Sequence, residues 1–543
     1  MPTPEFEWQA YKIPADAADA LSTFERAAPA EAPATIHLPV LTAFPTPLDK
    51  ARILLESAAE IEHALLVQYL YAEFSLKQPD ELSDPAQKQA VDSWIGTLHG
   101  VSRQEMGHLM TAQNLLLSIG MPPNLEREDF PPQKDLYPFK MHLEPLSQRS
   151  LAKYVAGESP ADAAGIDDIL ALANESAGAP INHVGVLYGL LAVVFSTKEE
   201  IDRGGSGSES WDGMLRELAA AAHQQAPPEA WHLTDTAIDP TTEARQGDHG
   251  WERGNKVFLI SDRASALVAI RDVAEEGEGS VEGAESHFSR LLAMFRGSDE
   301  IMPFPAPGTF VPAYAVPTDP RADYIAEPRT KRWAQLADTR YAILLGAIEQ
   351  HLRISDDGDR RMLRNWAITD MRTLETLSHR LTKLPNGAGV AALPFTLPTR
   401  LSLPDDEAAR WQALLARLTV SIETIEELQH ADPADAADET LASLLEDTRQ
   451  RRDVLTQGHA PATTSFATDI RPLFRPMDIA HMNNMVGIDL TAHDTVSELG
   501  AAISGRLKLP RDDRRRMPPP PDDPWPPERI ALFDKWVAEG SPA

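Results

Sequence analysis

The 543-residue chain contains no cysteine. This absence excludes disulfides, thiolate metal sites, iron–sulfur clusters, covalently attached haem and cysteine nucleophiles. Any metal must therefore be held by Glu, Asp and His side chains, which suit iron, manganese or zinc.

The chain also lacks an excess of basic residues and lacks long apolar runs. Lys and Arg total 50 against 82 Asp and Glu, a formal net charge of −32. We therefore expect neither nucleic acid nor an anionic membrane as a partner, since both need a basic surface. The longest apolar run, Val184–Phe195, is too short to cross a bilayer and predicts a buried helix. The N-terminus has no basic segment followed by an apolar one, so no secretory signal is expected and the default location is cytoplasmic.

One helix that the chain does predict, Val101–Ser118, contains Glu105 and His108 among apolar residues at helical spacing. Three positions apart, the two side chains point the same way. Burying a carboxylate and an imidazole without a partner, a proton or a metal is costly. Glu-x-x-His is the unit that holds metal in four-helix carboxylate bundles. The motif is weak by itself, because a Glu and a His also pair locally on helix surfaces, so further ligands must come from elsewhere.

The first strong helix, predicted from Thr46 to about Leu76, offers two choices. Glu62 lies on an apolar face of this helix. Glu60 and His63 form a second Glu-x-x-His pair on the same helix. Spacing alone leaves both choices open.

Two later helices contain further candidates. His183 lies near the start of the third core helix, predicted over residues 182–195, and is either a ligand or a partly solvated histidine at a helix end. A fourth helix starts at Arg263, is interrupted by glycines at 277–283, and has Glu278 and His287 flanking the interruption. Glycine inside a helix costs stability, and such breaks often have a function.

The remaining segments predict connections and further helices. Prolines in residues 121–180 predict a loop-rich excursion, and residues 200–260 predict a surface insertion with a loop that contains Trp231 and His232. More helices follow to about Leu455. We expect an extended N-terminal arm (1–47), a helical metal-binding domain (48–456) and a small C-terminal helical domain (462–543).

Three elements occur in a fixed order: Gln-Tyr-Leu-Tyr-Ala at 68–72, Arg-Gln-Glu-Met-Gly-His at 103–108, and Glu-Gly-Glu-Gly at 276–279 followed by Ser-His-Phe at 286–288. In order and rough spacing they resemble the ferritin-like domain of the iminophenyl-pyruvate dimer synthase family. Enzymes of this family couple oxidised tryptophan-derived imines in bisindole pigment pathways. The resemblance covers roughly residues 49–430. It implies an all-α fold, a ferritin-like four-helix bundle with additional helices and long loop insertions.

The resemblance selects Glu62 over Glu60, because Glu62 stands at the family's distance ahead of Gln-Tyr-Leu-Tyr. At the position where the family's third helix has a glutamate, this chain has Val186. His183, one turn earlier, is the candidate to replace it; otherwise one metal position is weak or empty. The metal ligands that the resemblance implies are Glu62, Glu105, His108, Glu278 and His287.

The C-terminal segment resembles a cytochrome-c-type module, through residues 466–474, Met517-Pro-Pro and the segment from Leu532 to Gly540. Both haem-attachment cysteines are missing, while His481 and Met517 remain. Covalent haem is therefore excluded. We expect no haem; His481 and Met517 are the only candidates for non-covalent ligation.

These features together predict an iron-dependent oxidase or oxygenase with one or two ions, acting on O2 and a small amino-acid-derived or aromatic metabolite. Manganese or zinc could replace iron, and no catalytic residue is assigned. The alternative is a non-catalytic metal-binding or assembly protein with a degenerate redox site. A homo-oligomer or a complex with a pathway enzyme fits either function.

Overall fold

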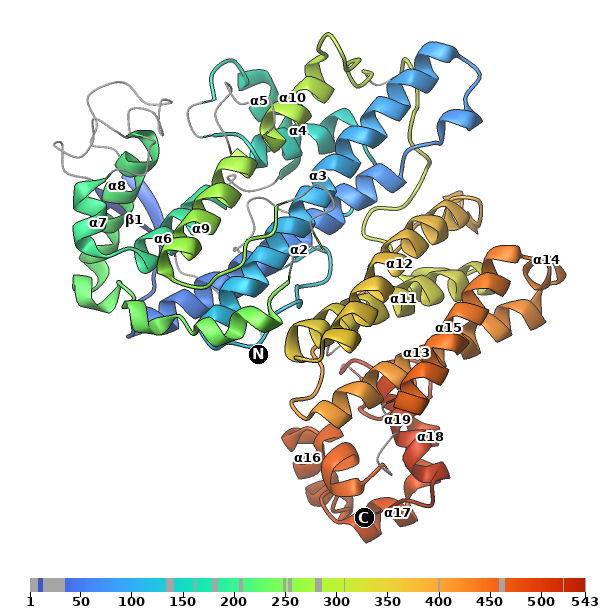
Figure 1. Ribbon diagram of the computed structural model, residues 1–543. Helices are drawn as coiled ribbons and strands as arrows, with labels where there is room; N and C mark the ends of the chain where they lie inside the picture. Colours follow the sequence, from blue (N-terminus) through green and yellow to red (C-terminus); the bar gives the residue numbers. More distant parts are fainter. Residues whose placement is uncertain are drawn as a thin grey trace. The chain divides into compact units, whose positions relative to one another are not determined.

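The structure is a computed structural model that describes residues 8–12, 35–132, 141–160, 163–177, 184–204, 209–247, 251, 256–278, 286–306, 308–398, 401–458, 464–520 and 522–542. These residues are mostly helical, with only short strands, which confirms the predicted all-α class (Figure 1). None of the helices in these ranges is long and apolar enough to cross a membrane.

The chain forms two compact units. The first contains residues 1–320, 352–355 and 388–392, and the second contains 321–351, 356–387 and 393–543. Helices between residues 328 and 458, which the sequence assigned to the metal-binding domain, thus group with the C-terminal segment. The domain boundaries drawn from the sequence stay a prediction.

The first unit consists of helices, short 3-10 turns and one strand pair. Its helices are α2 (Pro47–Phe74), α3 (Pro85–Ser118), α4 (Gln148–Gly157), α5 (Asp167–Ala177), α6 (Val184–Phe195), α7 (Lys198–Arg203), α8 (Glu209–Gln225), α9 (Arg263–Glu278) and α10 (His287–Arg296). The 3-10 turns are η1 (Pro79–Glu81), η2 (Pro228–Ala230), η3 (Asp235–Ala237) and η4 (Pro240–Arg245). The loop-rich prediction for 121–180 was wrong where α4 and α5 form.

The two longest helices of this unit start at well-defined caps. Thr46 and Asp49 form a capping box at α2, and the Asp84 side chain accepts hydrogen bonds from Ala86 N and Gln87 N at α3. A proline occupies the first turn of each helix, where its missing N–H costs nothing. The long α3 therefore extends the predicted helix by several turns at its N-terminal end.

Four of these helices, α2, α3, α6 and α9, form a bundle, and α10 and α4 pack beside it. Helix α2 packs on α3 and α6, α9 packs on α6 and α3, and α10 packs on α3 and α4 (Figure 1). Helix α6 is apolar on all sides, and from Leu187 to Phe195 every residue is buried. Such a helix is stable only inside a core, as the apolar run predicted.

Part of the predicted N-terminal arm is a strand pair. Strand β1 (Trp8–Lys12) pairs antiparallel with β2 (Thr35–Pro39), with Trp8 opposite Pro39. The Gln225 side chain at the end of α8 holds the following segment, accepting from Leu41 N at 2.8 Å and donating to Pro39 O at 3.0 Å. Within the described residues, the end of the arm is thus fixed on α8.

The second unit contains η5 (Ala322–Tyr324), α11 (Pro328–Arg353), α12 (Asp357–Leu381), α13 (Glu407–Ala431), α14 (Pro433–Ala436) and α15 (Glu439–Gly458). Two-residue strands, β3 (Pro385–Asn386) and β4 (Gly389–Val390), follow α12. The C-terminal segment adds a short π-helical turn, η6 (Phe466–Ile470), and η7 (Arg471–Leu473). Its helices are α16 (Pro476–Val486), α17 (His493–Glu498), α18 (Gly500–Leu507) and α19 (Pro527–Ala538). Helix α13 packs on α15 and on α19.

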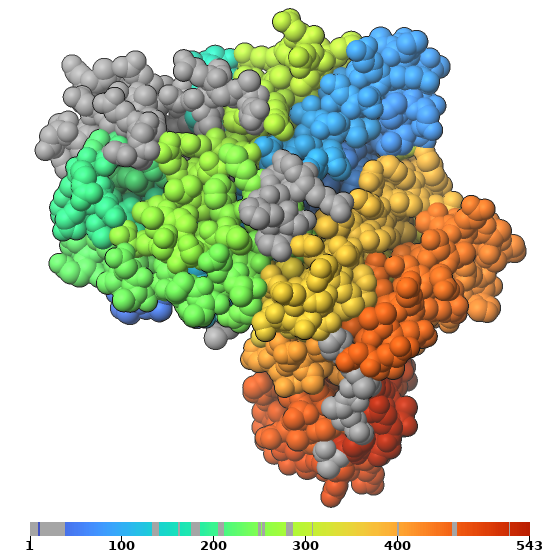
Figure 2. Space-filling model, viewed as in Figure 1, coloured from blue at the N-terminus to red at the C-terminus, as the bar shows by residue number. Residues whose placement is uncertain are grey.

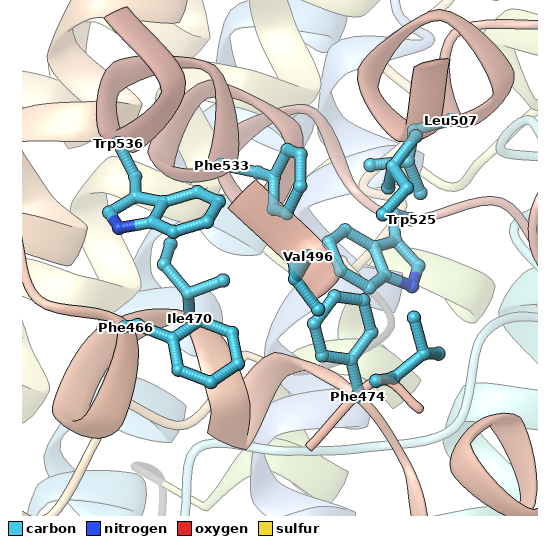
Figure 3. Packing of buried hydrophobic residues seen from close by; sticks show 10 residues of the cluster. Phe466, Ile470, Phe474, Val496, Leu507, Trp525, Phe533 and Trp536 are labelled. Atoms are coloured by element: carbon cyan, nitrogen blue, oxygen red, sulfur yellow. The ribbon is translucent and has the colours of Figure 1, made fainter. Parts of the chain in front are cut away.

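The C-terminal segment has an aromatic core. Phe466, Phe474, Trp525, Phe533 and Trp536 pack against one another with aliphatic residues between them (Figure 3). His481 lies exposed on α16, and Met517 is half-buried against this core. The expectation that no haem binds, with His481 and Met517 as the only candidates for non-covalent ligation, stays a prediction.

Candidate metal centre

Carboxylate and imidazole side chains converge inside the bundle of the first unit. Five of them are buried, with at most 6% of their surface exposed, and Glu276 is half-buried. They are Glu62 on α2, Glu105 and His108 on α3, Glu158 at the C-terminal end of α4, Glu276 on α9 and His287 at the start of α10.

The first group of side chains surrounds His108. Its Nδ1 lies 3.3 Å from Glu105 Oε2 and 3.5 Å from Glu62 Oε2. One potential ligand atom from each of the three residues lies within 4.8 Å of the others. Ligand atoms that lie this close to one another can bind one metal ion together.

The second group of side chains surrounds His287. Its Nδ1 lies 3.0 Å from Glu105 Oε1 and 3.7 Å from Glu158 Oε2. These three residues also offer ligand atoms within 4.8 Å of one another. The ring centroids of His108 and His287 are 5.4 Å apart.

Glu105 belongs to both groups, with Oε2 toward His108 and Oε1 toward His287. A cavity of about 20 Å³ adjoins it, lined by Glu62, Leu65, Glu105, His108, Glu158, Gly185, Tyr188, Val273, Ala274 and Gly277. A carboxylate whose two oxygens face two histidines can bridge two ions.

The donor set fits a metal. Several of its buried polar atoms lack a hydrogen-bond partner, namely Glu62 Oε2, Glu105 Oε2 and both ring nitrogens of His287. Buried polar groups are normally hydrogen-bonded, so each exception needs an explanation. Carboxylate and imidazole donors suit iron, manganese and zinc, and an ion among these atoms would satisfy them together.

Outer residues orient this donor set. His108 Nε2 lies 3.2 Å from Glu276 Oε2. Glu276 can therefore hold a ring proton on Nε2 when Nδ1, which faces Glu62 and Glu105, binds an ion. Gln104 donates to Glu276 Oε1 and accepts from Arg290 at 3.0 Å.

Two tyrosines hold the outer carboxylates. The Tyr188 hydroxyl donates to Glu62 Oε1 at 2.5 Å, and the Tyr69 hydroxyl donates to Glu158 Oε1. Burial and the adjacent carboxylates raise the pKa of both tyrosines well above the ordinary value, so both phenols keep their protons.

Burial and mutual repulsion set the charges of the centre. Burial, followed by the charge of Glu105, raises the pKa of Glu62 to about 8. Burial also opposes ionisation of Glu105, but His287 and His108 outweigh it and hold its pKa below the ordinary value. Burial lowers the pKa of His287, and Glu105 reverses this and raises it to about 9. Without an ion the centre therefore balances its carboxylates with protons, which a bound cation would displace.

The structure brings four of the predicted ligands together: Glu62, Glu105, His108 and His287. Of the two choices on α2, Glu62 faces the centre, while Glu60 accepts a hydrogen bond from Glu128 N at 3.2 Å. The Glu278 side chain and the whole of His183 lie outside the described residues. Val186 is half-buried, and on α6 the described cavity lining consists of Gly185 and Tyr188. Metal ligation stays a prediction for all six candidates: Glu62, Glu105, His108, His183, Glu278 and His287.

Sequence reasoning missed Glu158 and Glu276. Glu276 had a signal, because it lies three residues after Val273 and one before Gly277, both on the cavity face of α9. Glu158 follows α4, in the segment that prolines marked as irregular, and no spacing rule ties it to the bundle.

Comparison with known proteins agrees with this architecture. A family model described as ferritin-like matches residues 55–296, from α2 to the end of α10. These residues form a ferritin-like domain. Nearly all of the candidate centre lies on helices of the ferritin-like domain, and its remaining residue, Glu158, directly follows α4 within the match.

Two curated relatives extend the likeness. The chain is 26% identical over 394 residues to dichlorochromopyrrolate synthase of Lentzea aerocolonigenes, covering 64% of this chain and 35% of the relative. It is 25% identical over 433 residues to 2-imino-3-(indol-3-yl)propanoate dimerase of Chromobacterium violaceum, covering 71% and 38% respectively. The chain thus spans little more than a third of either relative. No solved structure matches it.

Proposed function

We propose that the ferritin-like domain is an iron-dependent oxidase or oxygenase of a small amino-acid-derived or aromatic metabolite, with O2 as co-substrate. One observation carries the proposal: the two oxygens of Glu105 face two different histidines, and each histidine has a second carboxylate of its own. The enzyme names of both relatives support a catalytic role.

The ligands divide into two sets that share Glu105. Glu62, Glu105 and His108 would hold one iron, and Glu105, Glu158 and His287 the other. In this assignment Glu158 supplies the carboxylate that Val186 lacks. Bound as a pair, iron ions would supply the redox chemistry with O2.

The surrounding residues position these ligands and exclude water. With an ion on Nδ1, Glu276 would hold the ring proton of His108 at Nε2, and the hydrogen bond from Tyr188 positions the carboxylate of Glu62. Leu65, Val273 and Ala274 line the cavity with apolar surface. An apolar lining excludes water, which would otherwise compete with the oxidation of the substrate.

The cavity beside Glu105 has room for a molecule about as large as water. We infer that O2 enters this cavity.

The alternative function is a metal-binding or assembly protein without catalysis. Under either function, the cytochrome-c-like assignment of residues 462–543 and an oligomer or pathway-enzyme partner remain proposals.

Metal content and O2 uptake of the reconstituted protein test the proposal. After anaerobic loading with Fe²⁺, we expect about two irons per chain and O2 consumption. Glu105→Gln should lose both ions. Glu60→Gln, on the same helix as Glu62 but hydrogen-bonded to Glu128 N, is the matched control and should load normally. Less than about 0.2 iron per chain would contradict metal binding, and full loading without O2 uptake would favour the non-catalytic alternative.

A further inference from the structure

A second cluster of metal-ligating atoms lies away from the bundle centre, at the end of α8. His223, in the last turn of α8, and His232, shortly after η2, point their Nε2 atoms at each other across 3.1 Å. Their ring planes are nearly perpendicular, at 78°. Both side chains are half-buried, and α8 lies at the surface of the first unit (Figure 2).

The backbone fixes the tautomer of His232. Its Nδ1 lies 3.0 Å from Val193 O and 2.8 Å from Ser196 O, at the C-terminal end of α6. Carbonyl oxygens only accept hydrogen bonds, so Nδ1 carries the proton and Nε2 carries the lone pair. Metal-binding histidines are commonly held in this way, by a backbone carbonyl on the nitrogen that does not bind the metal.

The distance between the Nε2 atoms suits a shared ion. Zinc–nitrogen bonds of about 2.0–2.1 Å at a tetrahedral angle place two ligand nitrogens about 3.3 Å apart. The observed 3.1 Å is close to this value. The competing arrangement is a plain hydrogen bond, in which His223 Nε2–H donates to His232.

We propose that His223 and His232 are the protein ligands of a separate site for a borderline divalent ion, represented by Zn²⁺. The site would link α8, the loop after η2 and the end of α6. It is independent of the proposed oxidase function, because it shares no residue with the bundle centre. Its remaining coordination positions would be filled by water.

Zinc titration of the full chain, with His223→Gln as the key variant, tests this site. Glutamine at 223 can still donate a hydrogen bond to His232 but is a poor zinc ligand. We expect the wild-type chain to bind about one Zn²⁺ more than the variant, as measured by calorimetry on metal-free protein. His430→Gln, which changes an exposed histidine on α13, is the control and should bind as the wild type does. Equal zinc stoichiometry in the wild type and His223→Gln would overturn the proposal and leave a plain hydrogen bond.

A second measurement needs no variant. Diethyl pyrocarbonate modifies accessible imidazoles, and mass spectrometry locates the modified residues. We expect Zn²⁺ to protect His223 and His232 while His430 is modified equally with and without zinc. Unchanged modification of the pair at saturating zinc would overturn the proposal even if the variant failed to fold.

Discussion

Each of the two units buries a cluster of charged side chains, and the clusters differ in how their charges balance. In the second unit, Asp370 accepts from Arg340 on α11 and from Arg451 on α15, the latter at 2.9 Å. Asp447 adds a second carboxylate, 2.9 Å from Arg451 Nε. Two guanidinium groups thus meet two carboxylates.

The bundle centre has no such balance. Among the described residues, the ion pairs of Glu62, Glu105, Glu158 and Glu276 at this centre are with His108 and His287. The comparison teaches that burial alone does not mark a functional site. A cluster that neutralises itself stabilises the fold, whereas one with surplus carboxylates needs protons or a cation.

The largest expected effect comes from breaking the balanced cluster. Asp370→Ala leaves Arg340 and Arg451, both at most 2% exposed, without their shared carboxylate. The loss of one partner of a buried ion pair costs about 3–5 kcal/mol. We expect urea denaturation to show this loss. Asp447→Ala is the control, and since its side chain is 38% exposed we expect less than about 1 kcal/mol. Equal losses in the two variants would contradict the assignment of Asp370 as the centre of the network.

A smaller loss of stability is expected for Glu105→Gln at the bundle centre. After this substitution His108 keeps the carboxylates of Glu62 and Glu276, and His287 keeps that of Glu158, so the metal-free protein should lose less stability than Asp370→Ala costs. The gain in melting temperature on adding Fe²⁺ anaerobically should disappear, because that gain reports binding to the folded state. A variant that still gains stability from iron as the wild type does would remove Glu105 from the ligand set.

A smaller effect should follow from Glu276→Gln. Glu276 orients His108 without belonging to either group of ligand atoms. Changes to such outer partners typically weaken metal affinity about 10- to 100-fold. Competition against a chelator measures this, and a normal number of bound ions at saturation distinguishes weakened binding from loss of a ligand. Complete loss of one ion would instead make Glu276 a ligand itself.

The smallest effect concerns a partly exposed ion pair, which serves as a reference for both clusters. Arg263 donates to Glu200 at 2.5 Å and lowers the pKa of Glu200 to about 2. A depressed carboxyl pKa adds stability above its ordinary value of 4.5, and this contribution disappears as the pH falls from there toward 2. Glu200→Gln should therefore lower the melting temperature slightly at pH 7 and not at all near pH 2. A difference that grows toward low pH would show the sign to be wrong.

Helical spacing and the family resemblance together predicted much of the centre. Glu105 and His108 are ligand candidates three residues apart on one helix, so the chain itself sets their geometry. Glu62 and His287 needed the order of the sequence elements, because spacing within one helix says nothing about which helices are neighbours. The bundle followed from the family resemblance, and the buried α6 followed from its apolar run.

The rest depended on tertiary packing. Glu158 reaches the centre only because α4 packs on α10, a contact between segments about 130 residues apart. The sequence treated His232 as part of a surface loop, and its role became apparent only when the carbonyls at the end of α6 fixed its tautomer. Side chains presented by non-bundle segments leave no periodic signal in the sequence.

The shared position of Glu105 has a consequence for how the centre fills. Because one carboxylate serves both histidines, the two binding steps form a linked equilibrium. Under the proposed function, each iron would change the affinity for the other by the same factor, so the two ions would not load independently.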